Sequence, residues 1–214
     1  MRKEELRTPC YIVQKEKLEE NLRNFQKDSG RKPGARFCSP KKRSLCISCT
    51  RSSANIWMAQ RPAASMRRNL ERRRLGKENH IFSPAYKEGE FDEILSLCGH
   101  IVLNSPSQIR KYKERIRQAG KSPGIRVNPQ CSTQKEHAIY DPCAPGSRLG
   151  TVREQLSGEL MDGIEGIHFH TLCEQNSDAL EVTLKAVEEK FGRWLPKMKM
   201  DKFRRRTSHN ENRL

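Results

Sequence analysis

Short apolar segments alternate with amphipathic segments along most of this chain, and this alternation limits the fold more than any other feature. Apolar segments stand at PCYIVQ (9–14), HIVLNS (100–105), PGIRVNP (123–129) and GIEGIHFHTL (163–172). Between them, apolar residues recur at the three- and four-residue spacing of a helix face. Strands that alternate with helices form βα units around a parallel sheet. The sequence therefore predicts an α/β fold.

Four amphipathic stretches predict helices. The clearest start is at Ser105, which offers an N-cap, followed by Pro106 at the first helical position and Gln108 at the third. This helix should end near Gly120, and the first helix of the chain near Gly30. Asn176 or Ser177 should cap the last helix. The expected buried faces are Leu18, Leu22 and Phe25; Phe91, Ile94, Leu95 and Cys98; Ile109, Tyr112 and Ile116; and Leu180, Leu184, Val187 and Phe191.

The positive charge of the chain is confined to two blocks. The formal net charge is +16, of which residues 31–77 contribute +13 and residues 201–214 contribute +3. The remaining chain has as many acidic as basic residues, like an ordinary enzyme. Within 31–77 neither a helical nor a strand period survives. One interpretation is a basic arm that binds nucleic acid through its phosphates.

The other interpretation is that both blocks are translated out of frame. Tryptophan and methionine have single codons, so codons begun one base early at Trp57-Met58-Ala59 must encode Asp-Gly. The same shift over 36–47 permits an apolar strand ending in a lysine, at the codon overlapping Lys41 and Lys42. Codons begun one base late from Met200 force a tryptophan and permit a strand followed by Gly-Gly-Gly. In a neighbouring reading frame, both blocks therefore permit a strand-like amino-acid sequence.

The CxxC pair at Cys46 and Cys49, with Cys38 upstream, has metal-ligand spacing but lacks a second CxxC or HxxxH half. We predict no metal site there. The sequence contains no apolar run of 18 residues, and MRKEELRTPC lacks the apolar core of a signal peptide. We expect a cytoplasmic protein with mostly reduced cysteines.

Outside the two blocks, several segments resemble the carboxynorspermidine decarboxylase family of fold-type III, pyridoxal-phosphate-dependent decarboxylases. The segments are TPCYIV, FSPAYKEGEFDEILSLC, HIVLNSPSQ, GIRVNPQ, YDPCAPGSRLG and GIHFHTLCEQNSDAL. The resemblance implies an alanine-racemase-like (β/α)8 barrel followed by a β-domain, in a homodimer. We expect a partial barrel here, without the C-terminal β-domain, and such a chain is not expected to dimerise.

The resemblance divides the chain into four parts. Residues 1–30 would hold the first strand and helix of the barrel, and residues 78–199 further βα units. Residues 31–77 would be an irregular out-of-frame segment, and residues 200–214 an out-of-frame tail. The chemistry of such a barrel lies at the carboxyl ends of its strands.

The implied function is decarboxylation of carboxynorspermidine and carboxyspermidine to norspermidine and spermidine, with pyridoxal phosphate as electron sink. The Schiff-base lysine would fall near Lys41 and Lys42, where its strand is lost. The glycine cradle for the phosphate would be replaced by Arg204-Arg205-Arg206. We therefore predict a catalytically impaired chain. The alternative is a basic protein that binds nucleic acid through residues 31–77.

Some residues of the implied site survive. His170 matches the histidine that packs on the cofactor ring, and His168 shares its face of the strand. Arg126 matches a strand-end arginine near the cofactor. The alternative for His170 is a satisfied histidine of a barrel core, and the alternative for Arg126 is a partly buried, paired arginine. A zinc site of His168, His170 and Cys173 fits the ligand types but not the family pattern.

A loop with two prolines and two glycines, YDPCAPGSRLG, has the character of a segment that frames a site. Arg148 in this loop would bind a substrate carboxylate as a forked donor, or would form an ordinary surface ion pair. Asp141 opens the loop and is a second candidate for substrate binding. Glu174 would attract a polyamine ammonium group, or would simply begin the next helix.

Overall fold

The structure of the chain, a computed structural model, describes residues 12, 14–30, 38–40, 59–61, 78–134, 141–172, 175–198 and 200–203. It divides into two compact units, residues 1–79 and 80–214, which are described separately. Several sequence predictions lie outside the described residues. These are most of the strand at 9–14, the CxxC pair, Lys41, Lys42, Cys173, Glu174 and the arginines at 204–206.

The described residues of the first unit form one helix and short parallel strands. Helix α1, Lys15–Gly30, forms over the predicted range and ends at the predicted glycine. Strand β1, Cys38–Pro40, pairs in parallel with β2, Ala59–Arg61, and β2 pairs with the first two residues of β3. Both β1 and β2 lie inside 31–77, and the sequence pattern predicts neither. Pairing through backbone hydrogen bonds does not require the side-chain period from which strands are predicted.

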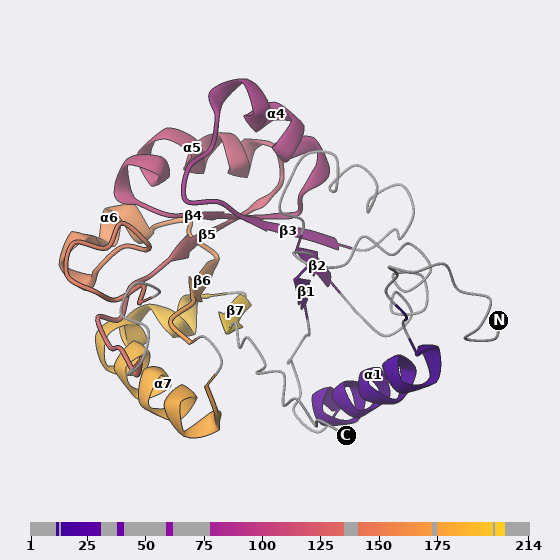
Figure 1. Ribbon diagram of the computed structural model, residues 1–214. Helices are drawn as coiled ribbons and strands as arrows, with labels where there is room; N and C mark the ends of the chain where they lie inside the picture. Colours follow the sequence, from indigo (N-terminus) through magenta and orange to yellow (C-terminus); the bar gives the residue numbers. More distant parts are fainter. Residues whose placement is uncertain are drawn as a thin grey trace. The chain divides into compact units, whose positions relative to one another are not determined.

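The second unit is a parallel sheet whose strands are neighbours in the order of the chain. The strands are β3, Glu78–Phe82; β4, His100–Leu103; β5, Ser122–Arg126; β6, Gly166–Phe169; and β7, Met200–Phe203. In Figure 1 the helices of this unit lie along the outer side of these strands. Consecutive parallel strands with helices outside are the pattern of a (β/α) barrel, so the predicted partial barrel is confirmed.

Two helices of the second unit begin where the sequence predicts a cap, at Ser105 and at Asn176, and the other two have no cap predicted from the sequence. They are α4, Glu88–Leu97; α5, Pro106–Gln118; α6, Gly158–Met161; and α7, Ser177–Phe191. Short 3₁₀ helices, η3 and η4, cover Arg153–Gln155 and Gly192–Lys197. The Ser105 hydroxyl accepts a hydrogen bond from the Gln108 N–H, as predicted for the cap of α5. Asn176 is the N-cap residue of α7 but makes no side-chain cap bond.

The core of this unit lies between the sheet and its helices. Every second strand residue points outward and packs on buried helix residues. Each such side chain stabilises the fold by about 1.5–3 kcal/mol through burial. The strands contribute Ile81, Ile101, Leu103, Ile125, Ile167 and Phe169, and the helices Phe91, Ile94, Ile109, Tyr112, Ile116, Val187 and Phe191. Within the described ranges, no helix is both long and apolar enough to cross a membrane.

Candidate active site

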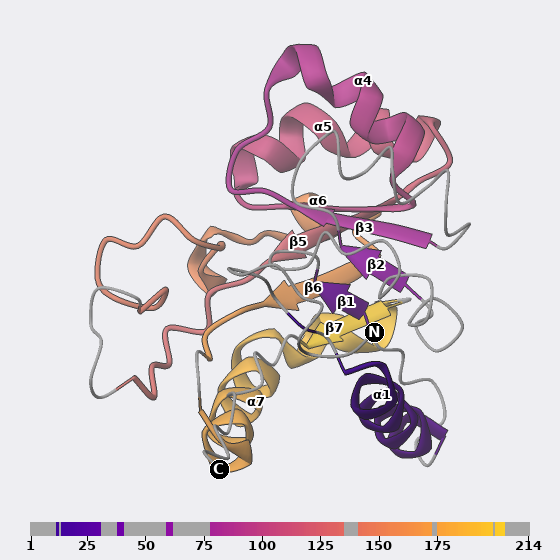
Figure 2. The same cartoon turned by 45° about the vertical axis from the view of Figure 1, so that its right-hand side comes forward.

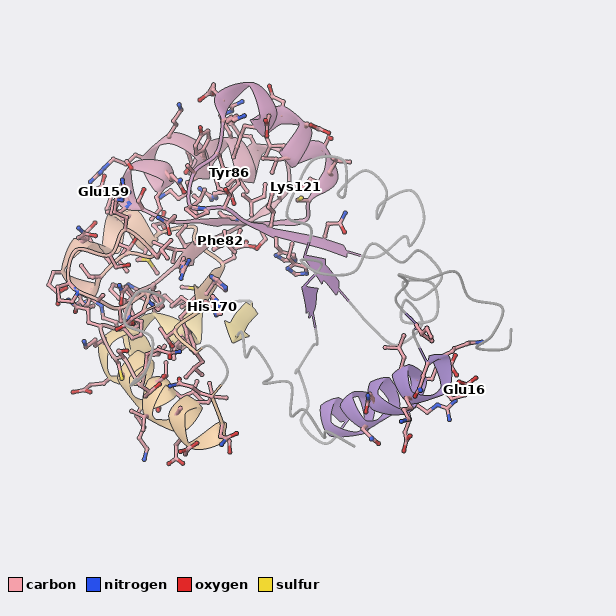
Figure 3. All side chains as sticks on the ribbon, in the orientation of Figure 1. Glu16, Phe82, Tyr86, Lys121, Glu159 and His170 are labelled. Carbon is pink, nitrogen blue, oxygen red and sulfur yellow. The ribbon has the colours of Figure 1, made fainter. Side chains whose placement is uncertain are left out.

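The remaining strand residues point to the opposite side of the sheet, here called the inner face. Its members are His80, Phe82, His100, Val102, Ser122, Gly124, Arg126, Gly166 and His168. The inner face is unusual because it combines polar and glycine residues. Figure 3 shows the labelled Phe82 and His170 on this side of the strands. A buried face that carries histidine and arginine is a candidate for chemistry, since burial of such groups costs free energy.

Arg126 is the last residue of β5, which is the strand-end position that the family resemblance implies. Its side chain is only 3% exposed. The guanidinium carbon lies 4.8 Å from the centroid of the Phe82 ring, and Nη2 donates a hydrogen bond of 3.2 Å to the carbonyl oxygen of His170. The ring face and the carbonyl both favour the positive charge. Arg126 is thus fixed at the carboxyl end of the sheet.

The two predicted histidines lie where β6 ends. His168 is buried within β6, in register with Arg126, and its ring centroid is 5.2 Å from that of Phe82. His170 follows the last residue of the strand and is partly buried. The structure therefore brings together Arg126 and His170, two of the predicted site residues, through the hydrogen bond between them.

Two glycines make room for this arrangement. Gly124 and Gly166 are register partners on β5 and β6, in the same row as Phe82. Because neither has a side chain, the Phe82 ring extends from β3 to Arg126 and His168. A hollow of about 10 Å³ remains between His100, Ser122, His168 and the two glycines, with Val102 and Ile167 completing its wall. It holds a water molecule at most. This hollow is too small to hold a cofactor ring.

The loop 141–151 extends past the strand ends (Figure 2). Asp141 is partly buried, and its Oδ1 accepts a hydrogen bond of 2.8 Å from the Cys143 N–H, which forms a local turn. Burial raises the pKa of the Cys143 thiol to about 11, and the charge of Asp141 adds to this effect. Arg148 is exposed. No hydrogen bond links Asp141 or Arg148 to Arg126 or His170 in the part of the chain that the structure describes.

Asn104, which directly follows β4, joins this loop to the sheet. Its Nδ2 donates to the Arg148 carbonyl at 2.8 Å, and its Oδ1 accepts from the Gly150 N–H at 2.9 Å. The Thr151 hydroxyl donates to the Asn104 carbonyl at 3.1 Å. Thr151 forms a parallel bridge with Val127. The last residue of β5 that pairs with β4 is Ile125. Beyond this point Thr151, in place of β4, pairs with the chain that continues from β5.

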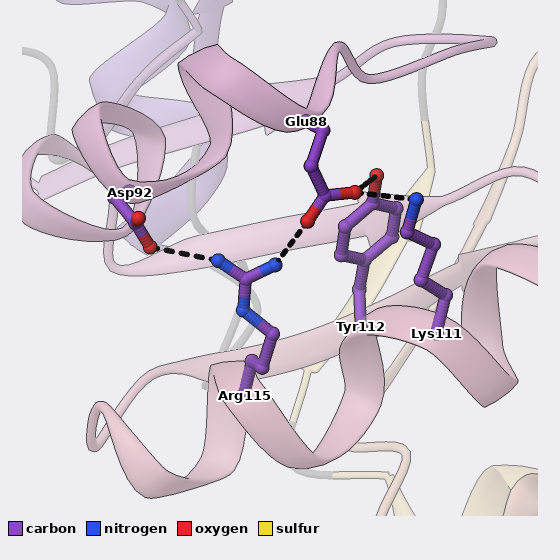
Figure 4. Close-up of polar contacts among 5 residues, drawn as sticks. All are labelled: Glu88, Asp92, Lys111, Tyr112 and Arg115. Carbon is purple, nitrogen blue, oxygen red and sulfur yellow. Dashed lines mark hydrogen bonds and ion pairs between the residues drawn. The ribbon is translucent and has the colours of Figure 1, made fainter.

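A second cluster lies on the outer side, between α4 and α5, away from the inner face. Figure 4 shows Glu88 bound by Lys111, Arg115 and Tyr112, while Arg115 also binds Asp92. Lys111 first, and then Arg115, hold the pKa of Glu88 below its usual value of 4.5. These groups are largely exposed, and the network joins two helices. We assign it to stability and not to chemistry.

Among the described residues, no group of three or more histidine, cysteine or acidic side chains is placed to hold a metal ion. The third ligand of the zinc alternative, Cys173, lies outside the described ranges.

Comparison with known proteins identifies the family. The chain is 34% identical to carboxynorspermidine/carboxyspermidine decarboxylase of Campylobacter jejuni over 200 residues, which is 94% of this chain and 51% of the relative. A carboxyaminopropylagmatine decarboxylase of Synechocystis is 33% identical over 90% of this chain and 49% of its own length. The chain belongs to the carboxynorspermidine decarboxylase family. It spans about half the length of these relatives, and no family model matches it.

Solved structures agree with this family and with the fold. The crystal structure of carboxynorspermidine decarboxylase from C. jejuni, in complex with norspermidine, has a TM-score of 0.81 at 33% identity, over 92% of this chain and 50% of that one. Diaminopimelate decarboxylase of Helicobacter pylori has a TM-score of 0.73 at 14% identity, over 90% of this chain and 52% of that one. Alanine racemase of Streptomyces coelicolor has a TM-score of 0.58 at 14% identity, over 85% of this chain and 49% of that one. The last two show the fold alone, which is the predicted alanine-racemase-like barrel.

Sequence reasoning missed two residues of this family member's strand-end region, Phe82 and Asn104. A positional signal existed for Asn104, since it directly follows a buried strand, as His170 does. Phe82 had no such signal. Its contact with Arg126 joins β3 to β5, two strands away, and strand order is not visible in a residue pattern.

Proposed function

We propose that this chain is half of a pyridoxal-phosphate-dependent decarboxylase whose substrate is a carboxylated polyamine, with carboxynorspermidine and carboxyspermidine as the first candidates. The observation that supports this most is the Arg126–His170 pair at the carboxyl ends of the strands, in a chain 34% identical to the C. jejuni enzyme. In barrels of this kind chemistry is located at those ends.

The described residues fit one wall of a site for a flat, anionic cofactor. When bound, pyridoxal phosphate supplies an electron sink for the carbanion that loss of CO₂ leaves. His170 would lie against its ring, and the buried charge of Arg126 would favour its anionic groups. Arg148 would bind the substrate carboxylate, Asp141 the ammonium groups, and Glu174 a further ammonium group.

We further propose that the chain as printed turns over little or no substrate. Its lysine would stand at Lys41 or Lys42, and Arg204 to Arg206 stand where the family has glycines; all lie outside the described residues. The match of 200 residues leaves fewer residues unmatched than the segment 31–77 contains, so the match includes part of this segment. This supports a place for the segment among the barrel strands of the relatives. We also propose that the chain divides into the four parts given above, with boundaries after residues 30, 77 and 199.

Two measurements test this proposal. The first is CO₂ release from carboxynorspermidine by the printed chain, with free pyridoxal phosphate alone as the background. We expect no release above background, and turnover at ordinary enzyme rates, about 1 s⁻¹ or more, would overturn the proposed impairment. The second is the nucleotide sequence for 31–77 and 200–214. A neighbouring frame without a lysine-bearing strand or a triple glycine would contradict the out-of-frame interpretation.

A chain with both frames restored, and continued with the C-terminal half of the C. jejuni relative, tests the family reaction itself. We expect it to release CO₂. A restored chain that folds but releases none would count against the assigned substrate, and the precursor named for the Synechocystis relative would be tried next.

The concentration of charge in residues 31–77, a net +13, favours nucleic-acid binding as a second candidate function. This alternative predicts that affinity for a DNA duplex falls steeply with salt. Fluorescence anisotropy across a salt series distinguishes the two, since a misread segment without a binding surface should give only weak binding.

We also propose a cytoplasmic location, because the described cysteines Cys98, Cys131 and Cys143 are free thiols.

A further inference from the structure

We infer that Asn104 is a positioning residue that fixes the loop segment 148–151 across the carboxyl ends of β4 and β5, and so sets where Arg148 presents its guanidinium. This inference rests on the proposed function, in which Arg148 binds the substrate carboxylate. It adds a residue that neither the sequence pattern nor the resemblance assigned.

Asn104 makes three hydrogen bonds to one short segment. Its amide binds the Arg148 carbonyl and the Gly150 N–H at the same time, at 2.8 and 2.9 Å. Its own carbonyl accepts from the Thr151 hydroxyl. An amide that both donates and accepts fixes the rotation of the loop as well as its distance. Asn104 is 6% exposed, so water competes little for these bonds.

Asn104 is itself held in place by further hydrogen bonds. The Asn104 N–H donates to Oε1 of Gln108 in the first turn of α5, at 2.7 Å. The Gln108 amide in turn donates to the Pro84 carbonyl, at 2.8 Å. The asparagine is therefore held by the strand before it and the helix after it. Groups on such rigid elements orient their partners better than groups on loops.

Backbone hydrogen bonds also join the segment to the end of β5. Thr151 N–H donates to the Arg126 carbonyl, and Asn128 N–H donates to the Thr151 carbonyl, both at 2.9 Å. These bonds place the segment directly beside Arg126, which holds His170. Arg148 is three residues before the bridge, so its Cα is placed by the Asn104 bonds. Its exposed side chain then starts from a fixed point near the candidate site.

The test uses Asn104→Ala in the full chain, with Asn176→Ala as the matched control. Asn176 is exposed and makes no side-chain cap bond. The first readout is the rate of tryptic cleavage after Arg148, followed by mass spectrometry. Trypsin can cut there only when the segment 148–151 detaches from Asn104. Cleavage after Arg110, within α5, reports global unfolding in the same sample. We expect the Arg148 rate to rise about tenfold or more, with the Arg110 rate unchanged.

The second readout is the ratio of the Kd for norspermidine to that for carboxynorspermidine, by calorimetry. A structural role alone would weaken both ligands equally, whereas a lost carboxylate contact changes the ratio. We expect Asn104→Ala to lower the ratio about as much as Arg148→Ala does, and the double variant to lower it no further. If Asn104→Ala does not fold, Thr151→Val, which removes only the hydroxyl bond, should produce the same changes to a smaller extent.

Each result has one meaning. Unchanged cleavage after Arg148 would overturn the inference, and so would faster cleavage with an unchanged ligand ratio. A chain that shows no preference for the carboxylated ligand would overturn the proposed role of Arg148, and the inference with it. Two results together support both the inference and the proposed role of Arg148. They are faster cleavage after Arg148, and a ratio of dissociation constants that Asn104→Ala lowers and the double variant lowers no further.

Discussion

Gly150 lies so close to Val127 that a Cβ atom on Gly150 would stand 2.9 Å from the Val127 carbonyl carbon. The Gly150 backbone also has a φ of +89°, which side chains other than glycine rarely allow. The loop that carries Arg148 is therefore seated on β5 by backbone contact as well as by Asn104. This contact leaves no room for a side chain at position 150.

We predict that Gly150→Ala lowers the free energy of unfolding by at least about 2 kcal/mol, because the new methyl group adds both strain at positive φ and overlap with backbone atoms. Urea denaturation measures the change. Gly146→Ala is the matched control for strain alone, since its φ is +79° and nothing lies within 4 Å. Gly89→Ala, in open space on α4, should be neutral or stabilising by up to about 1 kcal/mol. Equal effects at all three glycines would contradict the close contact.

The contact of Phe82 with Arg126 should be measurable as a coupling energy. The guanidinium lies 4.8 Å from the ring centroid, and Arg126 is buried. In a double-mutant cycle of Phe82→Leu and Arg126→Met, we expect a coupling of about 0.5–2 kcal/mol, because leucine fills the space but has no ring quadrupole. Chemical denaturation of the four chains gives the value. Strictly additive effects would show that the ring does not stabilise the charge.

The network on α4 and α5 predicts a pH dependence of stability. Lys111 and Arg115 lower the pKa of Glu88 from 4.5 in the folded chain. A carboxylate with a lowered folded-state pKa stabilises the fold fully above its unfolded value, and this contribution is lost as the pH falls through the lowered value. We expect Glu88→Gln to have a lower Tm than the parent at neutral pH. The difference should shrink below pH 4.5.

Glu189→Gln, on the exposed surface of α7, removes one negative charge in the same way and is the control. Its Tm should follow the parent across the pH range. High salt should also reduce the effect of Glu88→Gln, because these groups are exposed and screened. A Tm difference that persists unchanged into acid would rule out the ion pairs as its cause.

The Cys143 thiol should react slowly with alkylating reagents. Its pKa is raised from 9.0 to about 11, chiefly by burial. Since the thiolate is the reactive form, this shift lowers the iodoacetamide rate at mildly alkaline pH about 100-fold relative to the chain unfolded in urea. The rate should keep rising with pH until about 11. Peptide-resolved mass spectrometry separates Cys143 from the other cysteines.

Asp141→Asn provides the control for the electrostatic part of this shift. The substitution keeps the Oδ1 acceptor for the Cys143 N–H and removes the charge that raises the thiol pKa. We expect faster alkylation of Cys143 than in the parent. An unchanged rate would leave burial as the sole cause.

The helices of this chain could be predicted well from the sequence because their signals are local. The cap at Ser105, the proline at the first position of α5 and the apolar spacing that buries Ile109 and Ile116 all lie within one or two turns of each other. The short elements escaped prediction for the opposite reason. Strands β1 and β2 are each three residues long, and parallel partners from elsewhere in the chain provide their hydrogen bonds.

The same division applies to the candidate site. The family resemblance points to Arg126 and His170, and the structure places both where their strands end, at the common edge of a parallel sheet. The resemblance assigns no role to Phe82 or Asn104. The position of Asn104 directly after β4 is a signal, but its bonds to a loop more than 40 residues away, and the contact of Phe82 across the sheet, come only from the fold.

The sequence by itself determined the βα pattern, the N-cap of α5, the two blocks of positive charge and the family resemblance, since each is written in the order and type of neighbouring residues. Only the tertiary structure decided that Phe82 covers Arg126, that Thr151 replaces β4 beside β5, and that Asn104 holds the Arg148 loop. The physical reason is that hydrogen bonds and ring contacts act over a few ångströms in space. Residues far apart in sequence meet at such distances only after the sheet has set its order and register.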